Sequence, residues 1–244
     1  MMHANAIVAP HYFCNRHCDG WSPTAAGLRI HIANAHADDN DQATNRKPNS
    51  PGQVLGVYCM HPEVVDFPPV AIRNCIHLNC FTALFTVGRC RLAGAGPLTI
   101  YFPCSDETEQ AYLNGMEQAR QALGVHHLPN LRIRRWPPVT STDGPSSGAA
   151  MFCAVYSLFT RRLCRADSAV TAAVDAFAPM VIGVGELELK AEDAVAAGLT
   201  GLVMAQENEE DWAELPAVLT EQLEGVFVNN LDQMVDAMFL PLPL

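Results

Sequence analysis

The sequence from Asp143 to Gly148 reads Asp-Gly-Pro-Ser-Ser-Gly, and the apolar stretch GAAMFCAVYSLFTRRL occupies residues 148–163. Pro145 favours the first position of a helix, because its ring presets the helical φ angle and it has no N–H to leave unpaired. The apolar stretch predicts that this helix is buried. Ser146 would then stand at a helix N-terminus, where free N–H groups and the helix dipole can stabilise an oxyanion. Ser146 is therefore the candidate nucleophile.

The base that would activate this serine has to be found elsewhere in the chain. The string satisfies G-x-S-x-G, the nucleophile turn of α/β-hydrolases, but those enzymes need a histidine after the serine. The last histidine is His127, which excludes that mechanism, and the single lysine after Ser146 is Lys190. A neutral lysine can deprotonate a serine. Such a base needs its pKa lowered by about 3 units through burial.

The neighbours of Lys190 leave a second interpretation open. Glu186 and Asp193 lie on either side of it, at positions that meet Lys190 on a helix. Both carboxylates would stabilise the lysine as a cation. Lys190 would then be a surface ion-pair residue, and Ser146 would be only a helix-start serine.

The chain after about residue 52 alternates strand-like and helix-like patterns. Strands are predicted for GQVLGVYCM, GPLTIYF, NLRIRRW and LTGLVMA, at residues 52–60, 96–102, 130–136 and 199–205. Helices are predicted at residues 106–123, 148–163, 190–198 and 231–239. Such alternation predicts an α/β (α+β) domain.

A polar linker with two prolines, ADDNDQATNRKPNSPGQ, occupies residues 37–53 and predicts a boundary between two units, 1–36 and 54–244. The first unit is too short to form a stable hydrophobic core unless a disulfide or a bound metal supports it. Its spacing Cys14-x3-Cys18-x12-His31-x4-His36 offers two thiolates and two imidazoles, which can close a tetrahedral zinc shell. The spacing resembles that of the C2H2 zinc finger, and this resemblance implies a small ββα unit holding one structural Zn²⁺.

The predicted finger has few features that favour DNA. In the finger family three helix positions read bases, and here they fall on Thr24, Gly27 and Ile30, none of which makes a bidentate contact to a base edge. The formal net charge of −11 also disfavours a phosphate backbone. We therefore expect the finger to contact a protein partner, and sequence-specific DNA binding is disfavoured.

The second unit resembles the peptidase domain of Lon proteases over roughly residues 52–240. The family's nucleophile lies in a D-G-P-S-x-G string, which Asp143–Gly148 matches, and Lys190 stands near the family's lysine, before a helix ending in Ala197-Gly198. The family keeps a threonine after an Arg-x-Asp string, and Thr171 follows Arg165-Ala166-Asp167 in the same way. The resemblance implies a Ser146–Lys190 dyad with Thr171 orienting the lysine.

The resemblance also implies unfolded proteins or peptides as substrates, and self-association, because the family's peptidase domains form rings. Lon proteins carry an ATPase module as well, but these residues contain no G-x-x-x-x-G-K-[ST] string. Any peptidase activity is therefore expected to be independent of ATP.

The chain departs from the family pattern at two places. Ala172-Ala173 replaces a Gly-Glu pair, and the segment before Lys190 is acidic, with one residue inserted. The alternative is a catalytically inactive scaffold that docks partners through the finger.

Composition sets the remaining limits. No apolar run approaches the roughly 20 residues that span a bilayer. The nine cysteines are odd in number and lie mostly among apolar residues. Apart from Cys14 and Cys18, they are expected to be reduced core residues of an intracellular protein, with cytosol, nucleus and mitochondrion left open.

Overall fold

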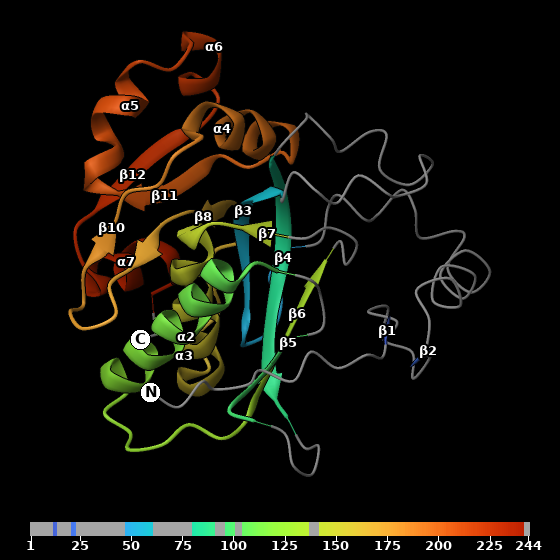
Figure 1. Ribbon diagram of the computed structural model, residues 1–244. Helices are drawn as coiled ribbons and strands as arrows, with labels where there is room; N and C mark the ends of the chain where they lie inside the picture. The colour runs from blue at the N-terminus through green and yellow to red at the C-terminus, as the bar shows by residue number, and fades with distance from the viewer. Residues whose placement is uncertain are drawn as a thin grey trace.

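The structure, a computed structural model, describes residues 47–60, 80–90, 96–100, 104–136 and 142–241, together with one short strand pair near the N-terminus. In this part of the chain a mixed sheet of eight strands runs through the centre (Figure 1). Its strand order is β12-β11-β8-β3-β4-β6-β5, with β7 beside the end of β3. The strands are β3 Gln53–Met60, β4 Cys80–Arg89, β5 Leu98–Ile100, β6 Leu131–Trp136, β7 Thr142–Asp143, β8 Ser168–Val170, β11 Gly201–Ala205 and β12 Glu224–Val228.

The sheet is parallel on one side and mixed on the other. Strands β3, β8, β11 and β12 run parallel to one another, whereas β4 pairs antiparallel with both β3 and β6. Six α-helices accompany the sheet in the described part of the chain. They are α2 Asp106–Ala122, α3 Gly148–Thr160, α4 Leu187–Ala196, α5 Glu209–Ala213, α6 Ala217–Thr220 and α7 Leu231–Met238. The mixed α/β class predicted from the sequence is confirmed.

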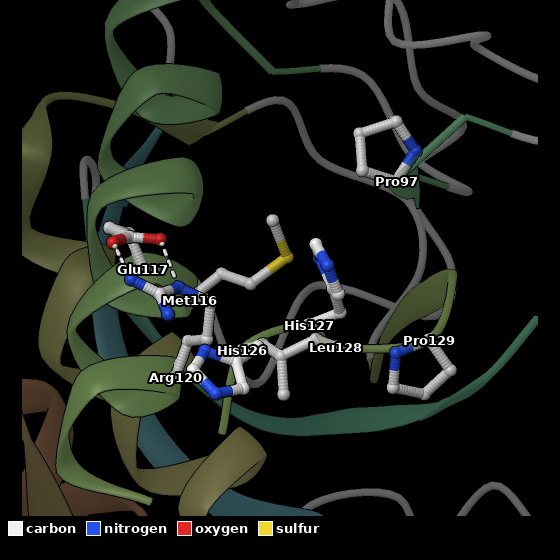
Figure 2. A pocket seen from close by; sticks show the side chains of 8 residues that line it. All are labelled: Pro97, Met116, Glu117, Arg120, His126, His127, Leu128 and Pro129. Atoms are coloured by element: carbon white, nitrogen blue, oxygen red, sulfur yellow. Dashed lines mark hydrogen bonds and ion pairs between the residues drawn. The ribbon is translucent and has the colours of Figure 1, made fainter. Parts of the chain in front are cut away.

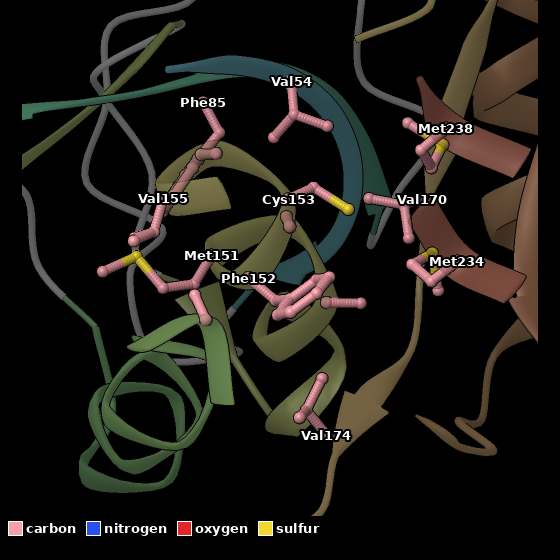
Figure 3. Packing of buried hydrophobic residues seen from close by; sticks show 14 of the residues in the cluster. Val54, Phe85, Met151, Phe152, Cys153, Val155, Val170, Val174, Met234 and Met238 are labelled. Atoms are coloured by element: carbon pink, nitrogen blue, oxygen red, sulfur yellow. The ribbon is translucent and has the colours of Figure 1, made fainter. Parts of the chain in front are cut away.

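The strands bury side chains on both faces, so the sheet separates two hydrophobic cores. Along β3, Val54 packs with α2, α3 and α7, while the next residue, Leu55, packs with α4. Successive side chains of a strand point to opposite faces, which produces this alternation. Figure 3 shows the first core, which gathers side chains of α3 such as Phe152 and Cys153 with Val54 of β3 and the methionines of α7. Helices α3 and α4 both contact β3 and β4, from opposite faces.

Two cysteines of the first core behave as small hydrophobic residues. Cys153 and Cys164 are free and buried. Loss of water raises the pKa of the Cys153 thiol, and it raises that of Cys164 to about 12. Both thiols therefore stay protonated near neutral pH, so the prediction that these two are core residues is confirmed.

Most predicted elements are present, with corrections at their ends. The helix predicted to start at Lys190 starts at Leu187, because Glu186 precedes it in a left-handed conformation with φ 58°. The helix predicted over 148–163 ends at Thr160, since Arg161 takes a left-handed φ of 63°. None of the described helices is long and apolar enough to cross a membrane.

Helices α2 and α3 approach closely at two glycines. A Cβ added to Gly115 would lie 2.3 Å from the carbonyl oxygen of Gly148 and 3.0 Å from the Cβ of Met151. The obstacle is backbone, which cannot rotate away as a side chain can. The crossing of α2 over α3, and with it the start of α3 where Ser146 stands, therefore depends on the absence of a side chain at Gly115.

We predict that Gly115→Ala destabilises the fold, although alanine has the higher helix propensity. Overpacking against backbone should lower the free energy of unfolding by about 2 kcal/mol, which is roughly 4–8 °C in Tm. Differential scanning calorimetry measures the change. Gly185→Ala is the matched control, because a Cβ there meets nothing within 4 Å. Equal Tm values for wild type and Gly115→Ala would contradict the close packing.

Candidate functional site

Ser146 stands in a tight connection between β7 and α3. Asp143 pairs with Cys59 of β3, and the chain then turns at Gly144, which has a φ of 78°. Pro145 begins a single 3₁₀ turn, η2 Pro145–Ser147, which runs directly into α3. The predicted helix-start position of Ser146 is confirmed, and its side chain is only 4% exposed.

A threonine of α2 holds this turn from the side. The hydroxyl of Thr108 lies 3.0 Å from the carbonyl oxygen of Gly144 and 3.2 Å from that of Thr142, with geometry to donate to either. Thr108 is fully buried and belongs to the first turn of α2, which Ser105 caps by accepting from the Thr108 N–H. The N-terminus of α2 thus fixes the backbone on the entrance side of Ser146.

Thr171 lies beside the same turn. Its N–H donates to the Val203 carbonyl at 2.9 Å, which extends the β8–β11 ladder by one residue. The next residue, Ala172, donates its N–H to the carbonyl of Ser146 at 3.2 Å. The Thr171 side chain is fully buried, and its hydroxyl has no hydrogen-bond partner among the described residues. The structure therefore brings the Ser146 and Thr171 segments together through their backbones.

Lys190 is buried on the face of α4 that covers the sheet. It is 2% exposed and shares this face with Leu187, Ala191 and Ala194. Its Nζ donates to the carbonyl oxygen of Gly185 at 2.7 Å. Ala169 of β8 belongs to the hydrophobic core that α4 covers. Thr171 follows two residues later in extended backbone, so its side chain lies on the same face of the sheet.

The two acids predicted to flank Lys190 have different surroundings. Glu186 is exposed, and among the described residues no ion pair joins it to Lys190. Its carbonyl oxygen instead accepts the backbone N–H of Lys190 at 3.1 Å. Asp193 is 6% exposed, and its Oδ2 accepts the hydroxyl of Thr82 at 2.6 Å. The surface ion-pair lysine considered above does not match the 2% exposure of Lys190.

The three predicted site residues thus occupy one region in different ways. Ser146 lies in the turn that leads into α3 on one face of the sheet, Lys190 belongs to α4 on the other face, and Thr171 directly follows the end of β8. Among the hydrogen bonds of the described residues, none joins Ser146 to Lys190. To act as a base, the Lys190 amine would have to turn its lone pair toward the hydroxyl of Ser146, which it can do while one N–H still donates to Gly185.

The predicted zinc ligands Cys14, Cys18, His31 and His36 lie outside the described residues. A short antiparallel pair, β1 Tyr12–Phe13 with β2 Trp21–Ser22, brackets the two cysteines in the sequence. Within the described part of the chain, no group of three or more His, Cys, Asp or Glu side chains could hold a metal. The zinc site stays a prediction.

A separate hollow of about 290 Å³ lies at the far end of α2 (Figure 2). Arg120 forms a bidentate ion pair with Glu117, at 2.6 and 2.8 Å, and also donates to the Val125 carbonyl. Hydrogen bonds from Arg120 and then Gln121 lower the pKa of Glu117 to about 2. The α2 residues that line it, Met116, Glu117 and Arg120, lie roughly 12–18 Å along the helix from Thr108, which supports the Ser146 turn. Its lining residues are Pro97, Met116, Glu117, Arg120, His126, His127, Leu128 and Pro129.

In this mixed α/β domain Ser146 thus stands just before one buried helix, and the buried Lys190 lies on another. Residues 86–241 match the family of the Lon protease (S16) C-terminal proteolytic domain. The chain belongs to this family.

Several Lon proteases are similar to this chain over the same region. The Lon protease of Methylocella silvestris is 32% identical over 156 residues, covering 61% of this chain and 19% of that protein. Lon protease homolog 2, peroxisomal, of Bos taurus is 36% identical over 161 residues, with the same coverage of 61% and 19%. Lon protease 4 of Sorangium cellulosum is 34% identical over 161 residues, covering 63% and 20%. The chain spans about a fifth of the length of these curated relatives.

The sequence interpretation overlooked Thr108, which supports the Ser146 turn. A local signal existed, because Ser105 followed by acidic residues and Thr108 is typical of a capped helix start. That signal predicts the cap, but it does not predict the bonds to Thr142 and Gly144, which lie more than thirty residues away.

We predict that Thr108→Val weakens the fold around Ser146, because valine keeps the shape but cannot donate to the two carbonyls. The expected loss is about 1–2 kcal/mol in the free energy of unfolding, measured by urea denaturation, with Thr108→Ser near wild type. Thr160→Val is the matched control, since the Thr160 hydroxyl bonds only to nearby backbone, donating to the Tyr156 carbonyl at 2.8 Å and accepting the Arg162 N–H at 3.5 Å. Equal losses at both threonines would contradict a special role for Thr108.

Proposed function

We propose that this chain is a serine peptidase that uses Ser146 as nucleophile and Lys190 as general base. The observation that carries the proposal is the burial of Lys190, at 2% exposure, on the sheet face where Thr171 lies. Burial disfavours the ammonium form of a lysine and so favours the neutral amine that a base requires. The buried, unpaired hydroxyl of Thr171 would orient that amine.

In the proposed reaction, Ser146 Oγ attacks the carbonyl carbon of a peptide bond while Lys190 Nζ takes the hydroxyl proton. Backbone N–H groups at the start of the η2 turn would hold the oxyanion. The Lys190 ammonium would then return its proton to the leaving amine, and the C–N bond would break. Water activated by Lys190 would hydrolyse the acyl-serine and restore both groups.

The proposed substrates are unfolded proteins or peptides. These residues contain no P-loop string, so the hydrolysis we propose uses no ATP bound by this sequence. Because the chain belongs to the Lon proteolytic-domain family, we also propose that it self-associates.

A second candidate function is a catalytically inactive scaffold that docks a protein partner through the N-terminal finger. Two observations favour it: Lys190 Nζ donates to Gly185 in place of Ser146, and the buried Asp193 follows three residues later on α4. A carboxylate there stabilises an ammonium and opposes a neutral base.

Hydrolysis of unstructured casein without ATP separates the two functions. Ser146→Ala and Lys190→Ala should each lower the rate at least about 100-fold, because each removes one half of the proton transfer. Ser147→Ala is the matched control and should keep wild-type activity, since the buried Ser147 hydroxyl has no hydrogen-bond partner among the described residues. A folded wild-type protein that leaves casein intact would favour the scaffold.

We further propose that Cys14, Cys18, His31 and His36 hold one structural Zn²⁺. Elemental analysis of the purified chain should find one zinc per polypeptide, and Cys14→Ser and His31→Ala should each lose it, because a closed tetrahedral site needs all four ligands. His126→Ala is the control and should keep the metal, as His126 is an exposed histidine of the other unit. Retention of zinc by Cys14→Ser would contradict this ligand set.

A further inference from the structure

The side chain of Asn208 is clamped on the backbone of the segment that precedes Lys190. Asn208 ends the 3₁₀ turn η3 Gln206–Asn208, which follows β11, and it is 2% exposed. Its Oδ1 accepts the N–H of Val184 at 3.1 Å, and its Nδ2 donates to the carbonyl of the same residue at 2.8 Å. The amide thus pairs with Val184 as a neighbouring strand would.

The clamp has further support from its own surroundings. The Nδ2 of Asn208 also donates to Asp211 Oδ2 at 3.2 Å, so both donors and the acceptor of the amide are used. The adjacent Glu207 accepts the N–H of Gly183 at 2.6 Å. A Cβ at Gly183 would lie 3.0 Å from Glu207 Oε2, which indicates how closely the segment packs on η3. The 183–184 backbone is therefore fixed from the carboxyl end of β11.

This fixed backbone carries the hydrogen-bond acceptor of Lys190. Gly185 follows Val184 directly, and its carbonyl oxygen accepts Lys190 Nζ at 2.7 Å. On its other side, Glu186 accepts the backbone N–H of Lys190 at 3.1 Å as α4 begins. A Cβ added to Gly185 would meet nothing within 4 Å, so no neighbouring group packs against that side of the residue. The place of its carbonyl is therefore set by the clamp before it and the helix after it.

We propose that Asn208 is a positioning residue for Lys190, acting through the Val184–Gly185 backbone. The carbonyl of Gly185 takes one N–H of the amine and thereby directs the remaining valences of Nζ. Without the clamp, that carbonyl moves and the lysine side chain gains freedom of rotation. The inference rests on the proposed function for its importance to catalysis, but the coupling of Asn208 to Lys190 is a property of the fold.

The sequence makes a direct test simple, because Lys47 and Lys190 are its only lysines. Lys47 is exposed and Lys190 buried, so a pulse of acetyl N-hydroxysuccinimide ester should label Lys47 first. Peptide mass spectrometry on the full chain gives the two rates and their ratio. Asn208→Ala should raise the Lys190 to Lys47 ratio at least about tenfold, the size expected from the loss of two buried hydrogen bonds. Asn208→Asp keeps the shape but loses the donation to Val184, and it should act in the same direction.

Ser157→Ala is the matched control for a general loss of stability. The Ser157 hydroxyl is also fully buried and also clamps backbone, accepting from Gly52 N and donating to Arg162 O, but at the other end of α3. Its labelling ratio should equal that of wild type. An unchanged ratio in both Asn208 variants, or an equal rise in Ser157→Ala, would overturn the proposal.

The labelling needs no catalysis, so it reports on Asn208 even if the wild type leaves casein intact. If the wild type cleaves casein, Asn208→Ala should lower kcat at least about tenfold with KM little changed, because the base rather than the substrate is displaced. A higher KM with unchanged kcat would overturn the positioning role and leave the dyad standing.

Discussion

The structure depends on a sheet that is covered on both faces. Because β3, β8 and β11 alternate side chains between two cores, α3 can pack only on one face and α4 only on the other. The serine in the turn before α3 and the lysine on α4 therefore lie on opposite faces, and they can approach each other only past the ends of the strands. The carboxyl ends of β8 and β11 provide this place, because Thr171 and η3 follow directly after those two strands. In open α/β sheets this is the usual place for a functional site.

Burial separates Lys190 from most of the carboxylates that surround it in the sequence. Thirteen carboxylates and a single base lie between Gly183 and the end of the chain, and that base, Lys190, is buried. Most of the acids are exposed, where water and salt screen them. Asp193 is the exception, and its Oδ2 is engaged by Thr82. Among the acids of this region, the buried Asp193 shares helix α4 with Lys190.

Local patterns in the sequence predicted the parts of the fold that local forces determine. Pro145 predicted the helix start at Ser146, and the amphipathic period predicted the helix that became α2. The start of α4 was misplaced, because Glu186 takes a left-handed conformation that only tertiary packing maintains in a residue with a Cβ. Strands β4, β8 and β12 went unrecognised. Strand β8 has three residues, too few for a period, and β12 alternates weakly at the sheet edge.

The burial of Lys190 could have been predicted from the sequence. Lys190 lies on the apolar stripe of its helix, together with Leu187, Ala191 and Ala194. The acidic residues near it in the sequence had instead favoured an exposed lysine. The residues that hold the site, Thr108 and Asn208, act across long sequence separations and left no such trace. Their arrangement bears on the choice between enzyme and scaffold. Burying a lysine costs more free energy than burying an apolar side chain, and this cost favours the proposed enzyme over the proposed scaffold. Lys190 Nζ donates to the Gly185 carbonyl, and the side chain of Asn208 holds the backbone of the preceding Val184, so the buried amine meets an acceptor whose neighbouring backbone is fixed.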